Sequence, residues 1–533
     1  MELNLRTTTD WKNFGNKQFV LKRYGDALKA YNVGLTLCNN EDLDLLTNRA
    51  AAYLNLEHFN KALEDTNRVL SSQPNHPKAI YRKAKALCGL SKCEEAIQFL
   101  KSAISRQNNK KPSKELSDLL EKAEIMREQQ ITLEYDVTEH FTNYFFRIDN
   151  WSEYYGPVEV QVIPGKGRGL VATEDIAEGK LIFCSRAFAI EFHDPESDSE
   201  TAEDFIKNDK EITSLHDDRT CLLIQKIYDR IQQDPELGKN IYQLFAGPNL
   251  ERLDPSKDDC SIPDARRISG IIRYNCFANS DDNTDAEKSS GIWTLPSFFN
   301  HRCIGQNCTW KIFGNFIMIR ACRLIRKGEE LQISYASPTW TYKVRQGLLI
   351  DRLGFRCDCE LCVSDRSLPK EVIVVRERLQ NLALKQSVDF VGLNPDADPA
   401  LIYKKFQESS SLLIEILQRL EDMHPNHGML NVLILDCLQQ LGMKYFGVGE
   451  YEKAANYMQR AHAIMKAVVL PHGAVETGLW IVGSYLQMGD IKKAKHFIQV
   501  LKKDAMLAHG TLKTLKMLGE WVIVAMEEHN IPL

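Results

Sequence analysis

The sequence predicts a multidomain α+β protein with an N-terminal α-solenoid, a central β-rich domain and a C-terminal helical domain. Small and aromatic residues recur with a fixed period at the start of the chain. From about residue 157 the pattern changes to short apolar strands separated by turns, and after residue 371 a helical period returns. At 533 residues the chain is long enough for three or four domains, each with its own core.

Composition and charge exclude several classes of protein. Apolar residues make up 44% and charged residues 26%, which is ordinary for a globular chain. A net charge of −5 gives no broad basic surface, so we expect no direct binding to nucleic acid. The sequence has no apolar run of membrane-spanning length and no apolar signal core. We therefore expect the 14 cysteines to be thiols or metal ligands, and the location to be cytoplasmic or nuclear.

Three related units occupy about 8–41, 43–76 and 77–110. Their anchor alanines, Ala27, Ala62 and Ala96, lie 35 and 34 residues apart. The pattern resembles the tetratricopeptide repeat, in which small residues let antiparallel helices pack closely. A charged helical extension follows, and we place the end of this domain near residue 150.

The resemblance to tetratricopeptide repeats also implies a binding groove. Positions that line the concave groove of such repeats hold cationic or amide side chains here: Lys12, Asn16, Asn48, Lys78 and Arg82. These five groove residues are similar to the carboxylate clamp of chaperone-binding repeats, whose donors suit a terminal carboxylate and an acidic side chain. The implied partner is the tail of heat-shock chaperones that ends in Glu-Glu-Val-Asp. The alternative is that the groove residues are ordinary solvated side chains.

Ordered motifs fill the central domain, 151–366. GKGRG (165–169) lies between two predicted strands; alone it predicts a hairpin turn, because it lacks the spacing and following helix of a phosphate loop. RYNCFAN, LPSFFNHRC, GEELQISYAS and FRCDCELC come after a predicted helical insertion at about 200–272. In this order the pieces resemble a SET domain, the fold of protein-lysine methyltransferases, and are closest to the SMYD lineage.

The C-x-C-x-x-C segment predicts a zinc site through Cys357, Cys359 and Cys362. Zinc prefers four tetrahedral ligands, and a set of thiols suits a closed structural site. The family supplies the fourth ligand from the cysteine after Asn-His, here Cys303. Cys308 competes with it, because this sequence has one residue more than the usual spacing before the next asparagine. A metal-free thiol cluster and a Cys-His nucleophile are weaker interpretations, since no third group or protease motif accompanies the pair.

The family resemblance implies S-adenosylmethionine as cofactor and a lysine of a histone or another protein as substrate. Tyr335, in GEELQISY, would orient the amine at the end of an apolar channel; otherwise it is a buried core tyrosine. An apolar channel that ends at a cation favours the neutral, nucleophilic amine. The residues expected at the cofactor are Lys166, Gly167, Arg168, Asn275, Asn300, His301, Tyr335 and Phe355.

Two departures from the family bear on function. The cysteine-rich MYND module is missing, because Cys184, Cys221 and Cys260 are too few for two zinc ions. Leu353 stands where SMYD proteins often have a second channel tyrosine, which leaves the number of methyl groups open. The competing interpretation is therefore a catalytically weak or inactive SET scaffold that serves as a tetratricopeptide co-chaperone or adaptor.

The C-terminal domain, 367–533, is helical by pattern from residue 371. Gly449, Tyr451, Ala454 and Ala461 match one repeat, and a second match follows about 40 residues later. The segment is similar to the tetratricopeptide-like domain that closes the substrate cleft of SMYD proteins. A generic helical bundle packed on the central domain predicts much the same periodicity. We expect a linker at 393–400.

Overall fold

The computed structural model describes residues 7–106, 113–138, 147–192, 218–254, 256–281, 284–391, 399–423 and 432–533. The start of the predicted insertion, 200–217, and most of the predicted linker, 393–398, lie outside these ranges. The chain divides into two compact units. The first is Met1–Tyr135, Phe145–Tyr154 and Arg186–Thr294, and the second is Asp136–Tyr144, Tyr155–Ser185 and Leu295–Leu533.

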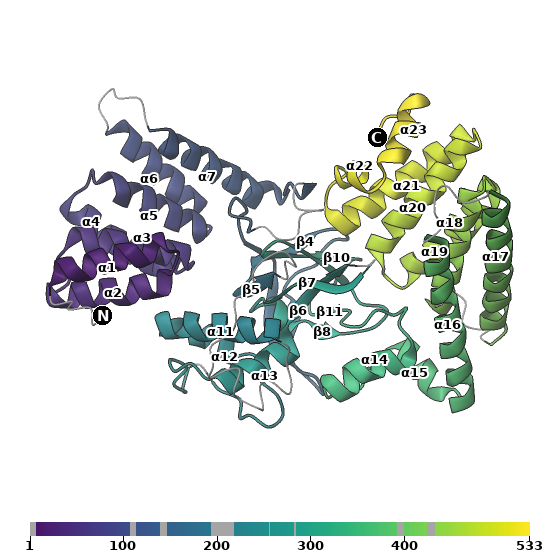
Figure 1. Cartoon of the computed structure of the whole chain (residues 1–533), viewed down its shortest axis with the longest axis horizontal. Helices are drawn as coiled ribbons and strands as arrows, with labels where there is room; N and C mark the ends of the chain where they lie inside the picture. Colours follow the sequence, from purple (N-terminus) through teal and green to yellow (C-terminus); the bar gives the residue numbers. More distant parts are fainter. Residues whose placement is uncertain are drawn as a thin grey trace. The chain divides into compact units, whose positions relative to one another are not determined.

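Antiparallel helix pairs make up the start of the first unit (Figure 1). The helices are α1 (Thr8–Val20), α2 (Tyr24–Leu37), α3 (Leu43–Asn55), α4 (Phe59–Ser72), α5 (Pro77–Gly89), α6 (Cys93–Ser105) and the longer α7 (Lys114–Thr132). The anchor alanines Ala27, Ala62 and Ala96 are fully buried, so helices of neighbouring pairs approach closely there. The predicted α-solenoid is confirmed.

Helix starts in this unit follow local sequence signals. A capping box begins α1, because the Thr7 hydroxyl accepts from the Asp10 N–H and the Asp10 carboxylate accepts from the Thr7 N–H. Asp42 caps α3, and Pro77 occupies the first turn of α5, where its missing N–H has no cost.

The first unit also contains a small sheet and an amphipathic helical segment. The sheet has the order β5 (Ala189–Phe192), β7 (Thr284–Ile292), β6 (Phe277–Asp281), and the helices are α11 (Asp218–Gln233), α12 (Gly238–Tyr242) and α13 (Ala265–Asn275). The turn between α3 and α4 contacts this segment, since the Glu57 carboxylate lies 3.7 Å from the Arg230 guanidinium of α11. The repeats and this segment belong to the same compact unit.

Two four-stranded sheets form the centre of the second unit. One has the order β1 (Tyr154–Tyr155), β4 (Leu181–Arg186), β10 (Phe316–Ala321), β9 (Cys308–Phe313). The other has the order β2 (Val158–Ile163), β3 (Gly167–Ala172), β11 (Glu330–Ile333), β8 (Asn300–His301). Here β11 pairs antiparallel with β3 and parallel with β8, which aligns Gln332 with Asn300 and Ile333 with His301.

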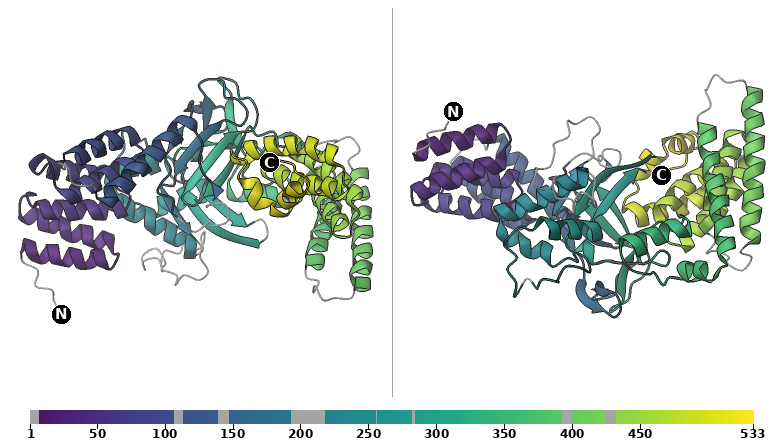
Figure 2. Two further views of the ribbon diagram at one scale, coloured as in Figure 1. Left: turned by 90° about the horizontal axis from the view of Figure 1, so that it is seen from above. Right: turned by 60° about the horizontal axis from the view of Figure 1, so that its bottom comes forward.

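Short helical elements lead from the sheets to the C-terminal helices. They are α14 (Tyr342–Gln346), a π-helical turn (Gly347–Arg352) and α15 (Glu360–Ser367). The C-terminal helices are α16 (Lys370–Val391), α17 (Pro399–Asp422), α18 (Leu435–Gly447), α19 (Tyr451–Ala467), α20 (Pro471–Gln487), α21 (Ile491–His509), α22 (Thr514–Leu518) and α23 (Glu520–Glu528), of which α18 to α21 pack consecutively (Figure 2). Among the described residues, no helix is long and apolar enough to span a membrane.

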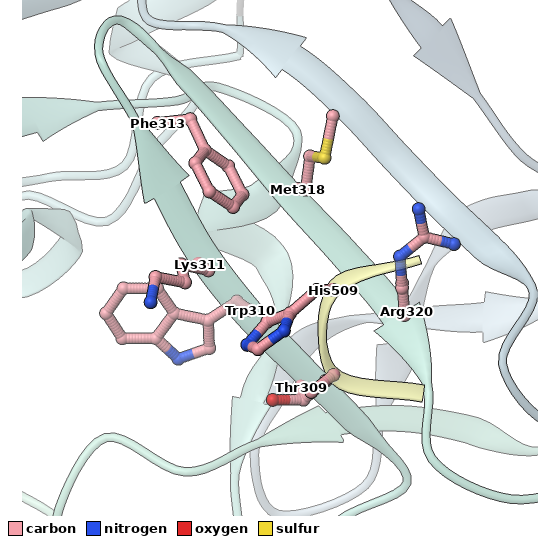
Figure 3. A pocket seen from close by; sticks show the side chains of 8 residues that line it. Thr309, Trp310, Lys311, Phe313, Met318, Arg320 and His509 are labelled. Atoms are coloured by element: carbon pink, nitrogen blue, oxygen red, sulfur yellow. The ribbon is translucent and has the colours of Figure 1, made fainter. Parts of the chain in front are cut away.

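The C-terminal helices pack on the β9–β10 hairpin within the second unit. Figure 3 shows His509, from the end of α21, beside side chains of both strands. The rings of His472 and His509 stack with centroids 5.2 Å apart, and His472 Nε2 lies 3.4 Å from the Thr309 hydroxyl. Gly510 ends α21 in the left-handed conformation, directly against the Arg320 guanidinium, where a side chain would collide.

Candidate functional site

The GKGRG segment forms the hairpin turn between β2 and β3, as its residues alone predict, and it also contacts the Asn-His pair. Gly167 has a φ of 84°, which favours glycine. A side chain at Gly169 would place Cβ only 2.6 Å from Asn300 Nδ2. The backbone carbonyl of Arg168 accepts from the same Nδ2 at 3.3 Å, so this turn and Asn300 form one surface.

Glu330, which the sequence analysis did not single out, joins these residues. Its carboxylate accepts from Lys166 Nζ at 2.9 Å, from Asn300 Nδ2 at 2.8 Å and from Gln332 Nε2 at 2.9 Å. GEELQISY contains two consecutive glutamates, and the sequence offers no signal that the second faces the glycine turn.

Tyr335 lies beside His301 and Phe355. Its N–H donates to His301 Nδ1 at 2.9 Å, and its hydroxyl donates to the Phe299 carbonyl. Ring centroids lie 5.0 Å apart for His301 and Tyr335, and 6.4 Å apart for Tyr335 and Phe355. Burial raises the pKa of Tyr335, so the hydroxyl stays protonated at neutral pH and keeps lone pairs free to accept from an amine.

Asn275 is placed differently from the other residues expected at the cofactor. It ends α13 in the first unit, where its Nδ2 donates to the carbonyls of Phe245 at 2.8 Å and Ile271 at 2.7 Å. The other expected cofactor residues belong to the second unit, and contacts through Glu330, His301 and Tyr335 connect them.

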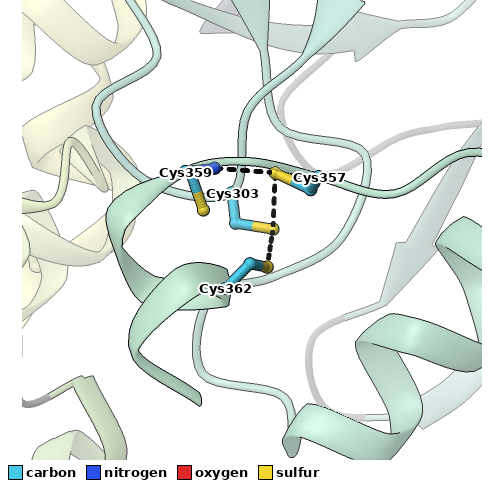
Figure 4. Close-up of side chains that lie close together, drawn as sticks. All are labelled: Cys303, Cys357, Cys359 and Cys362. Atoms are coloured by element: carbon cyan, nitrogen blue, oxygen red, sulfur yellow. Dashed lines mark hydrogen bonds between the residues drawn. The ribbon is translucent and has the colours of Figure 1, made fainter. Parts of the chain in front are cut away.

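Four cysteines meet at the end of the central domain: Cys303, Cys357, Cys359 and Cys362. This cysteine cluster is buried, and its sulfur atoms all lie within 4.8 Å of one another. Figure 4 shows the Cys303 sulfur between those of Cys357 and Cys362, with the Cys362 sulfur at 3.5 Å. Four buried thiols at this spacing fit a structural zinc ion. Cys308 lies apart in β9, where its thiol donates to Asn307 Oδ1 at 3.4 Å.

His301 couples the cysteine cluster to Tyr335. Because His301 Nδ1 accepts from the Tyr335 N–H, the ring proton of the neutral imidazole is on Nε2, 3.0 Å from the Cys303 sulfur. Donation to a ligating sulfur is a common outer-shell interaction in metal sites. Burial raises the pKa of Cys308, which lies outside the cluster, well above its usual value.

The additional residue after Cys303 forms a turn that contacts the C-terminal helices. Gly305 has a φ of 74°, and the buried Gln306 donates to the carbonyls that follow α19, those of Val469 at 2.8 Å and Val468 at 3.4 Å. The turn formed by the longer spacing therefore contacts the C-terminal helices, while Cys303 remains in the cysteine cluster.

A buried ion cluster lies next to the cysteine cluster. The Asp365 carboxylate binds the guanidinium groups of Arg345 and of Arg376, the latter at 2.9 Å, and all three side chains are at most 6% exposed. Arg345 comes from α14, Asp365 from α15 and Arg376 from α16. The cluster thus joins the end of the central domain, the cysteine segment and the first C-terminal helix.

Leu353 follows the π-helical turn and packs against the core that contains the four cysteines. Its N–H donates to the Leu348 carbonyl at 3.0 Å. The side chain at this position therefore contributes to the packing around the cysteine cluster.

The groove residues of the first and second repeats contact one another. Asn16 Oδ1 accepts from Asn48 Nδ2 at 3.0 Å and from the Tyr31 hydroxyl at 2.9 Å. Lys12 Nζ lies 3.2 Å from an Asp44 carboxylate oxygen that is itself largely exposed. These contacts orient amide and ammonium donors of α1 and α3 toward one surface.

The third repeat adds two cations on α5. Arg82 donates to the Thr47 carbonyl at 2.5 Å, which brings it beside Asn48 on the neighbouring helix, and Lys78 is exposed one turn earlier. Burial lowers the pKa of Arg82, because water is partly excluded around its guanidinium.

Known proteins that are similar to this chain include methyltransferases and co-chaperones. The family model "SET domain" matches residues 167–336, which confirms the resemblance to a SET domain. A "Methyltransferase" of Gibberella zeae is 24% identical over 436 residues, covering 75% of this chain and 58% of that protein. "Protein-lysine N-methyltransferase SMYD4" of Homo sapiens is 29% identical over 198 residues, 33% of this chain and 24% of that protein. "Hsp70/Hsp90 co-chaperone cns1" of Schizosaccharomyces pombe is 36% identical over 95 residues, 17% of this chain and 26% of that protein. The chain spans less than two thirds of the length of each of these relatives.

Proposed function

Because the chain carries a SET domain and N-terminal tetratricopeptide repeats, we propose that it is an S-adenosylmethionine-dependent protein-lysine N-methyltransferase that its repeats recruit to chaperones or their clients. The observation that carries the enzymatic part is the connected group of Lys166, Asn300, His301, Tyr335 and Phe355. Its substrate is a lysine of a histone or of another protein.

S-adenosylmethionine, when bound, supplies the methyl group as an electrophile. Lys166, the backbone of 167–168 and the Asn300 amide offer donors and acceptors for its amino-acid end, and Phe355 offers an apolar face for its base. The Tyr335 hydroxyl accepts from the lysine amine and orients its lone pair. The apolar surroundings disfavour a second cation, which favours the neutral amine.

The cysteine cluster would hold zinc as a structural ion. Its ligands come from both sides of the SET core, so metal binding fixes Asn300 and His301, before Cys303, relative to Phe355, before Cys357. Loss of zinc is therefore expected to weaken cofactor binding as well as stability.

The groove residues are proposed to bind the carboxylate-ended tails of heat-shock chaperones. Amide and cationic donors from three helices suit a terminal carboxylate together with an acidic side chain. The similarity to a relative named as an Hsp70/Hsp90 co-chaperone falls in a segment that covers 17% of this chain. A chaperone partner and a cytoplasmic or nuclear location follow from this proposal.

One observation favours the scaffold alternative. Leu353 provides no hydroxyl where related enzymes often have a second channel tyrosine, and its side chain packs toward the cysteine core. A SET fold that binds cofactor without transferring methyl groups would then act as an adaptor.

Two measurements test the proposal. Calorimetry with S-adenosylmethionine should show one site per chain, and the protein should label lysines of a cell extract with radioactive methyl groups. Tyr335→Phe should keep cofactor binding and lose at least about tenfold in labelling rate, because only the orienting hydroxyl is removed. Cofactor binding without any labelling by the wild type would favour the adaptor, and absence of binding would refute the enzyme.

A further inference from the structure

We propose that Glu330 is a positioning residue that orients Asn300 and Lys166 for the amino-acid end of the cofactor. The inference rests on the proposed function. Three hydrogen bonds converge on the single carboxylate of Glu330.

The two carboxylate oxygens of Glu330 accept hydrogen bonds from different partners. Oε1 accepts from Asn300 at 2.8 Å, while Oε2 accepts from Lys166 and Gln332, both at 2.9 Å. The Glu330 side chain is 17% exposed, so water competes little for these contacts. An ionised carboxylate only accepts, so every neighbour must present an N–H to it.

This requirement decides which way the Asn300 amide points. Both hydrogens of its Nδ2 have acceptors, Glu330 Oε1 at 2.8 Å and the Arg168 carbonyl at 3.3 Å. A flipped amide would set Oδ1 against two acceptors. Oδ1 is therefore held on the opposite side as an acceptor, the group that an α-ammonium needs.

Lys166 is held by the same carboxylate. Its ammonium has three hydrogens, so the bond to Glu330 leaves donors for an α-carboxylate. Gly169 leaves room for this arrangement, because its missing Cβ would lie 2.6 Å from Asn300 Nδ2 and 3.3 Å from Glu330 Oε1. One acidic side chain thus prepares an acceptor and a donor for the two charges of an amino acid.

The adjacent glutamate provides a matched control. Glu329 belongs to the same GEEL segment, but its carboxylate binds Arg323 and Asn307 Nδ2, the latter at 3.1 Å. Glu329→Gln makes the same chemical change one residue away without touching Asn300 or Lys166.

The test is calorimetry of the full-length, zinc-loaded chain with S-adenosylhomocysteine, together with methyl-transfer kinetics. Glu330→Gln and Glu330→Ala should each raise the Kd about tenfold, because the Asn300 amide can flip and Lys166 loses its partner. At saturating cofactor, kcat should change by about twofold or less, since Tyr335 is untouched. Glu329→Gln should leave the Kd within about twofold of wild type.

A double mutant separates positioning from general destabilisation. If Glu330 acts through Asn300, adding Glu330→Gln to Asn300→Ala should weaken binding less than it does in the wild type. Three results would each overturn the role of Glu330 while leaving the cofactor assignment intact. They are full additivity of the two substitutions in the double mutant, wild-type affinity in both Glu330 variants, and equal weakening of binding by Glu329→Gln. If the wild type itself binds no S-adenosylhomocysteine, the cofactor assignment fails and this inference fails with it.

Discussion

The groove of the repeats and the centre of the SET domain are built in different ways. In the groove, each polar side chain stands on a helix that is packed by contacts within its own repeat or with the next, and Lys78 is exposed. In the centre, Asn300, Glu330 and Cys303 are fixed by partners far along the chain, and Cys303 is fully buried. Substitutions in the groove should therefore change binding alone, whereas substitutions in the centre should change binding and stability together.

Removal of one cluster cysteine should have the largest effect. Cys359→Ser should abolish binding of about one zinc per chain and cost at least about 5 kcal/mol, because metal binding contributes directly to folding. Elemental analysis and thermal unfolding are the measurements. Cys308 is also buried but lies outside the cluster, so the Cys308→Ser protein should retain its zinc. Retention of zinc by Cys359→Ser would refute the cluster as a metal site.

Disruption of the buried ion cluster should have the second-largest effect on stability. Asp365→Asn leaves the guanidinium groups of Arg345 and Arg376 buried without their carboxylate, which should cost about 3–5 kcal/mol. Scanning calorimetry measures this loss. Arg326→Ala breaks the exposed pair with Asp175 and should leave the free energy of unfolding almost unchanged. Equal effects of the two substitutions would contradict the importance of burial.

Acid should weaken the second unit through His472 and His509. Burial, with Lys311 adding to the effect, lowers the pKa of His472 to about 3, and burial together with His472, Lys311 and Arg320 lowers the pKa of His509. An unfolded histidine has a pKa of about 6.5, so as the pH falls below this value the unfolded chain binds protons that the folded state excludes. The free energy of unfolding is therefore highest above about pH 6.5 and falls as the pH drops, by about 1–2 kcal/mol through His472 at pH 5 and further in the same direction through His509.

Chemical denaturation at pH 7 and pH 5 measures this slope, the change of the free energy of unfolding with pH. His472→Gln should flatten it, while replacement of the exposed His529 by Gln should leave it unchanged. A wild-type slope in His472→Gln would show that this histidine is protonated as easily in the folded chain as in the unfolded one.

The smallest effect is expected in the groove. Arg82→Ala should weaken binding of a peptide ending in Glu-Glu-Val-Asp by about 1–2 kcal/mol, from a micromolar starting affinity, and should hardly change the melting temperature. Binding should also weaken as salt rises, since the contacts are partly exposed and charged. The decisive control is the same peptide with an amidated C-terminus. Equal binding of the amidated and free-acid peptides would exclude a carboxylate clamp.

The repeats and the centre of the SET domain differ in how much of their structure could be predicted from the sequence. The repeats could be predicted because their core depends on local periodicity: Ala27, Ala62 and Ala96 recur at the spacing that the helix pairs require. The strand order β2-β3-β11-β8 was not predicted, since no local pattern encodes which distant strands pair. The spacing of three cysteines indicated a metal site, while Cys303 was proposed from the family and is grouped with them by the structure.

The contacts that sequence reasoning missed share one physical cause. Glu330, Arg345 and Gln306 each act on residues brought close only by the tertiary fold. Charged and amide side chains are usually solvated, so nothing in the sequence separates these buried ones from the rest. Only their partners in the folded chain reveal them.

The pairing of β3 with β11 has a consequence for the order in which the chain folds. Lys166 and Glu330 are 164 positions apart, so this sheet cannot close until most of the intervening chain has been synthesised. Closing so long a loop is entropically costly, and folds that depend on such contacts form slowly. The helical repeats need only neighbouring segments and are synthesised first. A nascent chain would therefore present a finished groove, the surface proposed to hold chaperone tails, while its central sheet is still open.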